Sequence, residues 1–187
     1  MSLKLSREEI LSALGKLEPG LSRYCWIQEH VATCDVTKDA EFQKRFNGFY
    51  RVRRGPSWRS SYYALMHAAK EREILFPEVL ARLHQATGMV EASFASKLVA
   101  TLDPAKPVID SVVLSHFGLR LPHLHAIDRQ ARVVGIYRSL SEAHAELAAA
   151  PVARMIRDLF DQEFPNTNLT PLKKVDLVLW QIRSRDR

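Results

Sequence analysis

Cysteine, glycine and long apolar runs are scarce in this chain of 187 residues, which has seven glycines and two cysteines. Cys25 and Cys34 lie nine positions apart on one expected helix. Thiols so placed cannot easily meet in a disulfide, and their spacing matches no zinc site, so we expect reduced thiols. No apolar run approaches the roughly 20 residues that span a bilayer, and the N-terminus lacks the apolar segment of a signal peptide. We therefore expect a soluble, cytoplasmic protein without a membrane partner.

The composition is that of a globular protein with a basic surface. Apolar residues make up 47% of the chain, and 27 basic against 21 acidic residues give a net charge of +6. An excess of this size is compatible with a polyanionic partner such as DNA, and equally with a basic surface that has no such partner. The length fits one domain.

The apolar periodicity is helical almost throughout, and no strand of useful length is indicated. We expect an all-α fold of about ten helices in a single helical domain over residues 1–187, with two lobes as an alternative arrangement. Ser6 and the Thr170-Pro171 pair are expected to cap the first and last helices. The expected helices cover 6–18, 22–34, 38–50, 58–72, 77–86, 91–102, 110–118, 125–138, a stretch from Ser139 or Ser141 to 150, 151–163 and 170–182.

Lys97 and Asp110 are the candidate catalytic residues. A run of small residues precedes Lys97, which opens an apolar helical stretch, and Pro107-Val-Ile-Asp110 opens the next helix. If both side chains reached one cleft, the amine could attack a carbon atom while the carboxylate steadied positive charge. At neutral pH an unperturbed lysine is almost wholly protonated, so such a site must favour the neutral amine.

The stretch from Gly88 to Asp110 resembles the helix-hairpin-helix DNA glycosylase superfamily, which includes endonuclease III and the 8-oxoguanine glycosylases. The family signature is Leu-Pro-Gly-Val-Gly-x-Lys, an apolar helix, and a short apolar lead-in to an aspartate. Here Glu91-Ala stands for Leu-Pro, Ser93-Phe-Ala95 stands for Gly-Val-Gly, Ser96 is the variable position, and Lys97 and Asp110 follow. The resemblance implies a helix-hairpin-helix-like core over about 77–120. The four-cysteine cluster of endonuclease III is missing, and we expect no cofactor and no metal.

The resemblance also implies roles for these residues. Lys97 would attack C1′ of a damaged nucleotide and give a Schiff base, and Asp110 would stabilise the positively charged sugar. The small residues Ser93, Ala95 and Ser96 would let the backbone approach a DNA phosphate, although glycine permits a closer approach. The target base would have to leave the helical stack to reach the lysine. The implied function is base-excision repair, with abasic-site lyase activity as a further implication.

Both candidate residues also have an ordinary structural interpretation, which the sequence leaves open. Lys97 borders an apolar stripe along which a lysine commonly lays its stem. Asp110 precedes Ser-Val-Val as an ordinary N-cap. In that case the chain would be a non-catalytic DNA-binding or interaction module, or a helical scaffold protein with no nucleic-acid role.

A second candidate DNA-binding segment is rich in basic and aromatic residues. Over 44–59 the chain carries six basic residues and four aromatic ones, with Arg51, Arg53, Arg54 and Arg59 close to a Gly-Pro turn. Arginine can neutralise phosphate, and aromatic rings can stack on bases. The alternative places the aromatic side chains in the core, with the arginines on a solvated face. His123 and His125 could in principle ligate a metal, but they have no suitably spaced partner, so a surface loop is expected. The sequence does not indicate an oligomeric state.

Overall fold

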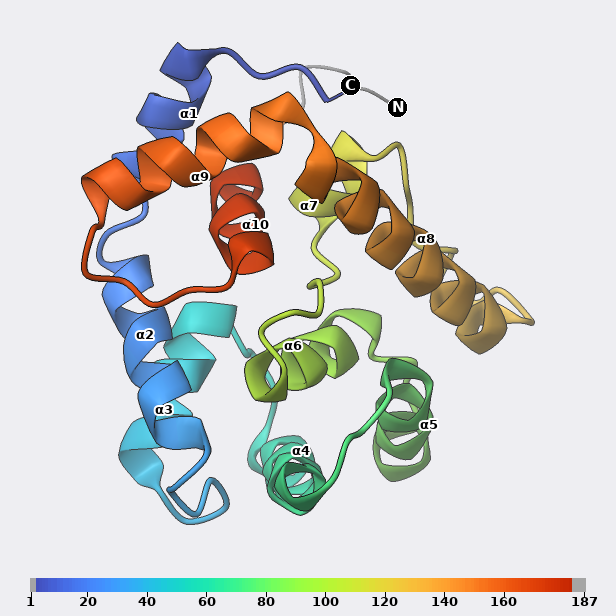
Figure 1. The fold of residues 1–187 in the computed structure, drawn as a ribbon. Coiled ribbons are helices and arrows are strands. Elements are labelled where there is room, and N and C mark those ends of the chain that lie inside the picture. Colours follow the sequence, from blue (N-terminus) through green and yellow to red (C-terminus); the bar gives the residue numbers. More distant parts are fainter. Residues whose placement is uncertain (1–2, 183–187) are drawn as a thin grey trace. The chain divides into compact units, whose positions relative to one another are not determined.

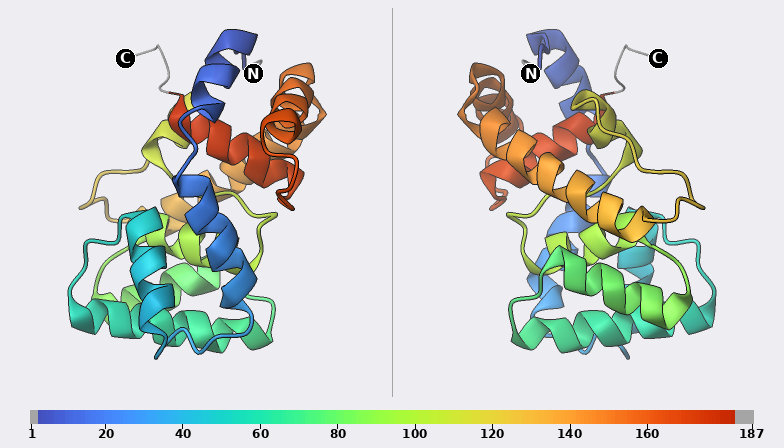
Figure 2. Two further views of the ribbon diagram at one scale, coloured as in Figure 1. Left: turned by 90° about the vertical axis from the view of Figure 1, so that its left-hand side faces the viewer. Right: turned by 90° about the vertical axis from the view of Figure 1, so that its right-hand side faces the viewer.

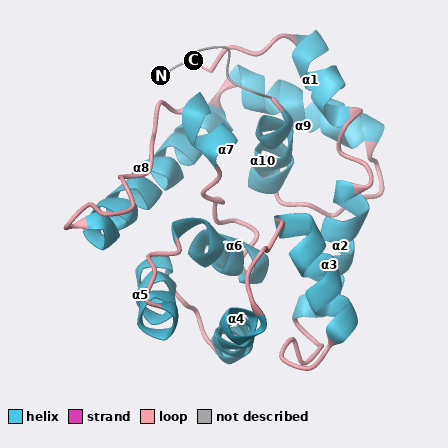
Figure 3. Cartoon of the chain, turned by 180° about the vertical axis from the view of Figure 1, so that it is seen from behind, coloured by secondary structure: helices cyan, strands magenta, loops and turns pink. Residues whose placement is uncertain are grey.

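The structure is a computed structural model that describes residues 3–182, and it is all-α as predicted. Within these residues there are ten α-helices and one short 3₁₀ helix (Figure 1). No strand occurs in the described part of the chain, which consists of helices joined by loops (Figure 3).

The chain divides into two compact units. Unit 1 consists of Met1–Glu18 together with Pro104–Arg187, and unit 2 consists of Pro19–Asp103. The predicted helix-hairpin-helix-like core over about 77–120 is therefore shared between them, because the boundary after Asp103 lies inside it.

Unit 2 is built from five α-helices packed around aromatic side chains. Helix α2 packs against α3 and α6, while α5 packs against α4 and α6 (Figures 1 and 2). Phe42, Phe46 and Tyr62 are fully buried in this core. The helical elements are α2 (Gly20–Val31), α3 (Ala40–Tyr50), α4 (Pro56–Ala68), the 3₁₀ helix η1 (Ala69–Glu71), α5 (Phe76–Thr87) and α6 (Ala92–Leu102).

The helix ends of unit 2 follow from local sequence. Asp39 caps α3 by accepting a hydrogen bond from the Phe42 amide at 2.9 Å. Gly88 ends α5 in the left-handed conformation (φ 70°), which glycine adopts without the steric penalty of a side chain. The turn that joins α5 to α6 therefore lies between Gly88 and Glu91.

Unit 1 contains the remaining five helices. Helix α9 packs against α1, α8 and α10, and α10 also packs against α1, α7 and α8. Ser6 forms a capping box with Glu9, and Thr170 caps α10 by accepting from the Lys173 amide, so both predicted caps are confirmed. The helices are α1 (Arg7–Leu14), α7 (Ser111–His116), α8 (Arg129–Ala149), α9 (Pro151–Glu163) and α10 (Pro171–Gln181).

The prediction of two helices over 125–138 and up to 150 is wrong, because α8 runs without interruption from Arg129 to Ala149. Instead of capping a new helix, Ser141 donates its hydroxyl to the Tyr137 carbonyl one turn earlier, at 2.9 Å. The chain leaves the helical conformation only at Ala150 (ψ 148°), and Pro151 then begins α9.

Candidate nucleic-acid interface and lysine site

Lys97 is half-buried on α6, and its amine lies at the end of α3. The Nζ atom donates a hydrogen bond to the Tyr50 carbonyl at 3.2 Å. It also lies 5.0 Å from the ring centroid of Phe94 and 5.7 Å from that of Tyr50. A carbonyl oxygen and two ring faces are all favourable neighbours for a positive charge. These neighbours favour the ammonium form of the lysine over the neutral amine.

The Tyr50 carbonyl is available because α3 stops there. Arg51 takes the left-handed conformation (φ 54°), and the next amide, that of Val52, turns back to the Asn47 carbonyl at 2.9 Å. Carbonyls at a helix C-terminus lack intrahelical partners and carry partial negative charge, which attracts cations. Lys97 thus acts as a C-terminal cap of α3, contributed by a helix that lies far away in sequence.

The loop from Arg51 to Gly55 follows directly, and its arginines differ in their surroundings. Arg51 and Arg53 are exposed, while Arg54 is partly buried. Arg59 is half-buried in the first turns of α4. Of the four arginines predicted to bind DNA, Arg51 and Arg53 therefore have the surroundings that suit a phosphate contact.

Arg54 forms an internal ion pair with Glu91, a pairing that the motif position of Glu91 did not predict. Its Nη2 lies 2.9 Å and 3.0 Å from the two carboxylate oxygens of Glu91. The Trp58 indole donates to the same carboxylate at 3.1 Å. The side chain of Glu91 is 7% exposed and that of Arg54 is 33% exposed. This cluster ties the loop, α4 and the start of α6 together.

The aromatic residues of the basic segment belong to the core, so the alternative interpretation is confirmed for Phe46, Phe49 and Tyr50, which are buried. Trp58 is less enclosed, but its ring stacks on Tyr62 with centroids 4.9 Å apart. Its ring also meets the Phe94 ring edge to face at 4.8 Å. These rings pack against one another, and Arg51 and Arg53 are the exposed arginines of the segment.

The small residues of the predicted hairpin lie in the first turns of α6. Ala95 and Ser96 are fully buried, and Ser96 donates its hydroxyl to the Ser93 carbonyl at 2.9 Å. The Ala95 amide donates to the Glu91 carbonyl at 2.8 Å as part of the helix. Direct contacts of Ala95 and Ser96 with DNA, which the resemblance implied, are therefore not available in this conformation, while Ser93 is half-buried.

Asp110 is the N-cap of α7, as the structural interpretation predicted. Its carboxylate accepts a hydrogen bond from the Val112 amide at 2.8 Å. It belongs to unit 1, whereas Lys97 belongs to unit 2.

The two histidines form no metal site. His123 and His125 lie in the loop between α7 and α8 with ring centroids 5.5 Å apart, and the His125 amide donates to the His123 ring. Among residues 3–182 no group of three or more histidine, cysteine, aspartate or glutamate side chains is placed to hold a metal ion. Cys25 and Cys34 are not joined in a disulfide, and burial raises the pKa of Cys34. None of the helices described is both long and apolar enough to cross a membrane.

Comparisons with known proteins identify no relative of this chain. A scan against models of protein families, a search of curated proteins and a search of solved structures each found no match to this chain.

Proposed function

We propose that this protein is a DNA-binding protein of the base-excision repair type. In this proposal, exposed arginines of the Arg51–Gly55 loop contact the phosphate backbone, and Lys97 is the nucleophile. The observation that carries the proposal is the position of the Lys97 amine, which is bonded to the carbonyl of Tyr50 immediately before that loop. A phosphate held by Arg51 would place the sugar-phosphate backbone near a lysine amine.

The reaction would begin with the neutral form of Lys97. Its lone pair forms a bond to C1′ while the bond from C1′ to the base breaks, and the base leaves with the electron pair and gains a proton. The bond from C1′ to O4′ then breaks and opens the sugar ring to a Schiff base; the nitrogen loses both of its protons, which are balanced by the proton gained by the base and the one gained by O4′. At an abasic site the same amine condenses with the C1′ aldehyde and releases water. Attack requires the amine to leave the Tyr50 carbonyl, because that contact favours the protonated form.

Covalent trapping on duplex DNA with an abasic site tests the chemistry. Borohydride reduces a Schiff base to a stable amine, so we expect a covalent complex with the unmodified protein and none with Lys97→Ala. Lys70→Ala is a matched control, because Lys70 lies in the same unit and also donates to a backbone carbonyl, that of Cys34. Trapping that persists in Lys97→Ala would overturn the role of Lys97. The resemblance also assigns Asp110 to this reaction, and Asp110→Asn tests that assignment, since asparagine keeps the cap.

A non-catalytic DNA-binding module is the second candidate function, and the surroundings of Lys97 favour it. A carbonyl and two aromatic rings stabilise the ammonium form, which has no lone pair for attack. In this case the protein binds DNA but yields no borohydride-stable complex, and Lys97→Ala leaves the affinity unchanged.

Both candidate functions require DNA binding through the Arg51–Gly55 loop, and the salt dependence of DNA affinity tests this. Each arginine that neutralises a phosphate contributes about −0.9 to the slope of log affinity against log salt concentration. The double variant Arg51→Ser/Arg53→Ser should therefore reduce the slope by about 2 and weaken binding to every sequence alike. Arg138→Ser/Arg154→Ser removes the same charge from exposed positions of unit 1 and controls for net charge. Equal losses in the two double variants would exclude the loop as the interface.

A further inference from the structure

A second candidate site lies wholly within unit 1, where a cavity of about 560 Å³ opens between α7, α8, the start of α9 and the N-terminal segment. Small-molecule sites in proteins usually measure roughly 300 to 1,000 Å³ and are mainly apolar with a few polar groups. The lining fits that description. It consists of Leu3, His116, Phe117, Ala143, Glu146, Leu147, Ala150, Pro151 and Val152.

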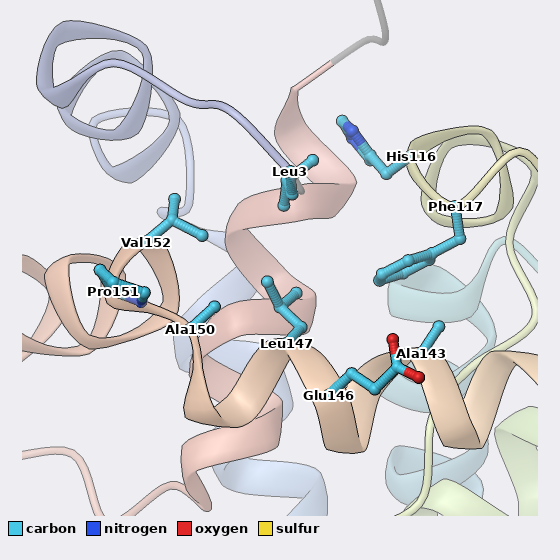
Figure 4. Close-up of a pocket in the computed structure, with 9 residues that line it drawn as sticks. All are labelled: Leu3, His116, Phe117, Ala143, Glu146, Leu147, Ala150, Pro151 and Val152. Atoms are coloured by element: carbon cyan, nitrogen blue, oxygen red, sulfur yellow. The ribbon is translucent and has the colours of Figure 1, made fainter. Parts of the chain in front are cut away.

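The charged and aromatic groups of this cavity are placed together. In Figure 4 the Phe117 ring and the Glu146 carboxylate lie on the same side of the cavity, with Leu3 and Val152 on the opposite side. Glu146 supplies the one acidic side chain among these lining residues, and no lysine or arginine is among them. A carboxylate beside a ring face is a favourable setting for an organic cation.

The wall that carries Phe117 is fixed by contacts on both sides. The neighbouring His116 places Nε2 2.7 Å from the Ile182 carbonyl and 3.1 Å from the Leu179 carbonyl. Because both partners are acceptors, Nε2 carries the hydrogen. The Phe117 ring packs against the buried His144 ring with centroids 5.0 Å apart. These contacts hold the ring in place without any ligand, which reduces the conformational entropy lost on binding.

We propose that this cavity binds a small organic cation, with the ammonium group on Glu146 and Phe117 and an apolar body against Leu147 and Val152. The inference does not depend on the proposed DNA-directed function, since every lining residue belongs to unit 1. A neutral or anionic molecule of the same shape lacks the charge that Glu146 recognises, so charge is the basis of selection.

Titration of the full chain with benzylamine, followed by amide chemical shifts, tests this proposal. Benzylamine is positively charged at neutral pH, and benzyl alcohol is a neutral molecule of almost the same shape. We expect benzylamine to shift the amide signals of Phe117, Leu147 and Val152 at lower concentrations than benzyl alcohol does. Glu146→Gln should weaken benzylamine binding by about three- to tenfold, the range expected for one charge-assisted contact at an exposed position.

Glu142→Gln is the matched control, because Glu142 is exposed on α8 one turn before Glu146 and lies outside the cavity lining. It should leave benzylamine binding unchanged. Equal binding of benzylamine and benzyl alcohol, or equal effects of the two glutamine variants, would overturn cation recognition, and absence of any shift would overturn the site. The double variant Arg51→Ser/Arg53→Ser should still bind benzylamine, so failure here is distinguishable from failure of the DNA proposal.

Discussion

Units 1 and 2 each bury a carboxylate beside a cation, and the two carboxylates differ in how fully they are hydrogen-bonded. In unit 2 both oxygens of Glu91 lie close to Arg54, and the Trp58 indole adds a further bond. In unit 1 Asp176 bonds Lys173 through Oδ2 at 3.1 Å, but its buried Oδ1 has no hydrogen-bond partner. The ion pair of unit 2 is also more exposed to solvent, since the side chain of Arg54 is 33% exposed and that of Lys173 is only 2% exposed.

The two ion pairs also differ in the elements that they connect. Lys173 and Asp176 lie three positions apart on α10, so their ion pair joins no separate elements. Arg54 and Glu91 are 37 positions apart and connect a loop to the start of α6. The buried ion pair of unit 1 therefore stays within α10. The ion pair of unit 2 instead positions the loop that carries the exposed arginines.

Breaking the unit 1 pair should have the largest effect on stability. Lys173→Met leaves Asp176 buried without its cation, which typically lowers the free energy of unfolding by about 3–5 kcal/mol. The double variant Lys173→Met/Asp176→Leu should recover most of that loss, because neither charge then remains. Urea unfolding monitored by circular dichroism measures both. A double variant as unstable as the single one would contradict this account of the pair.

Breaking the Arg54–Glu91 pair of unit 2 should lower the free energy of unfolding by less. Glu91→Gln retains an acceptor for Trp58 but removes the charge that Arg54 faces, and we expect a loss of about 1–3 kcal/mol, reduced by the partial solvation of Arg54. Glu78→Gln is the control, since it removes ion pairs with the exposed Arg72 and Arg82 and should lower the free energy of unfolding much less. A Glu91→Gln loss equal to that of Lys173→Met would remove the contrast between the units.

The two units should also respond to acid in different pH ranges. Burial lowers the pKa of His144 in unit 1 below 6.5; nearby Asp176 opposes this shift, and Lys173 adds to it. The unfolded state then binds more protons below pH 6.5, so unit 1 loses stability as the pH falls from 6.5 toward the folded-state pKa. In His144→Leu this loss should be absent between pH 7.5 and 5.5, as measured by hydrogen exchange of α8 and α10 amides.

Unit 2 should keep its stability over that range. The hydrogen bond from the Thr37 hydroxyl is the largest of the effects that lower the pKa of Asp35 from 3.8 to about 2; desolvation opposes it, and a hydrogen bond from Lys38 adds to it. The stabilising contribution of a carboxylate with a lowered pKa is present above the unfolded value and is lost as the pH falls toward the folded one. Acid destabilisation through Asp35 therefore begins below about pH 4. Exchange rates of α2 and α3 amides that rise already at pH 6 would contradict this assignment.

Helix caps should give the smallest difference between the units. Asp39 in unit 2 and Asp110 in unit 1 each cap a helix with one side-chain hydrogen bond to an amide. Replacing either with alanine should lower the free energy of unfolding by about 0.5–2 kcal/mol, while asparagine should be nearly neutral. A much larger loss for Asp110→Ala than for Asp39→Ala would indicate that Asp110 has a structural role beyond the cap.

Local sequence was sufficient for most of the helical architecture. Ser6, Thr170 and Asp110 cap helices through bonds to residues two or three positions away, so the sequence alone indicates them. The sequence-based prediction was wrong at α8, where it placed a new helix start at Ser139 or Ser141. A serine can either cap a new helix or donate to the backbone of its own helix, and the sequence does not distinguish the two.

The amino-acid sequence by itself determined the all-α class, the helix caps and the basic character of the segment around Arg51. Only the tertiary structure decided which charges are used internally. Arg54 pairs with Glu91, Lys97 caps a helix that ends 47 positions earlier, and Arg51 and Arg53 remain exposed. The reason is that such pairings depend on which distant elements pack together, and neither helical periodicity nor local spacing encodes the partner of a long side chain.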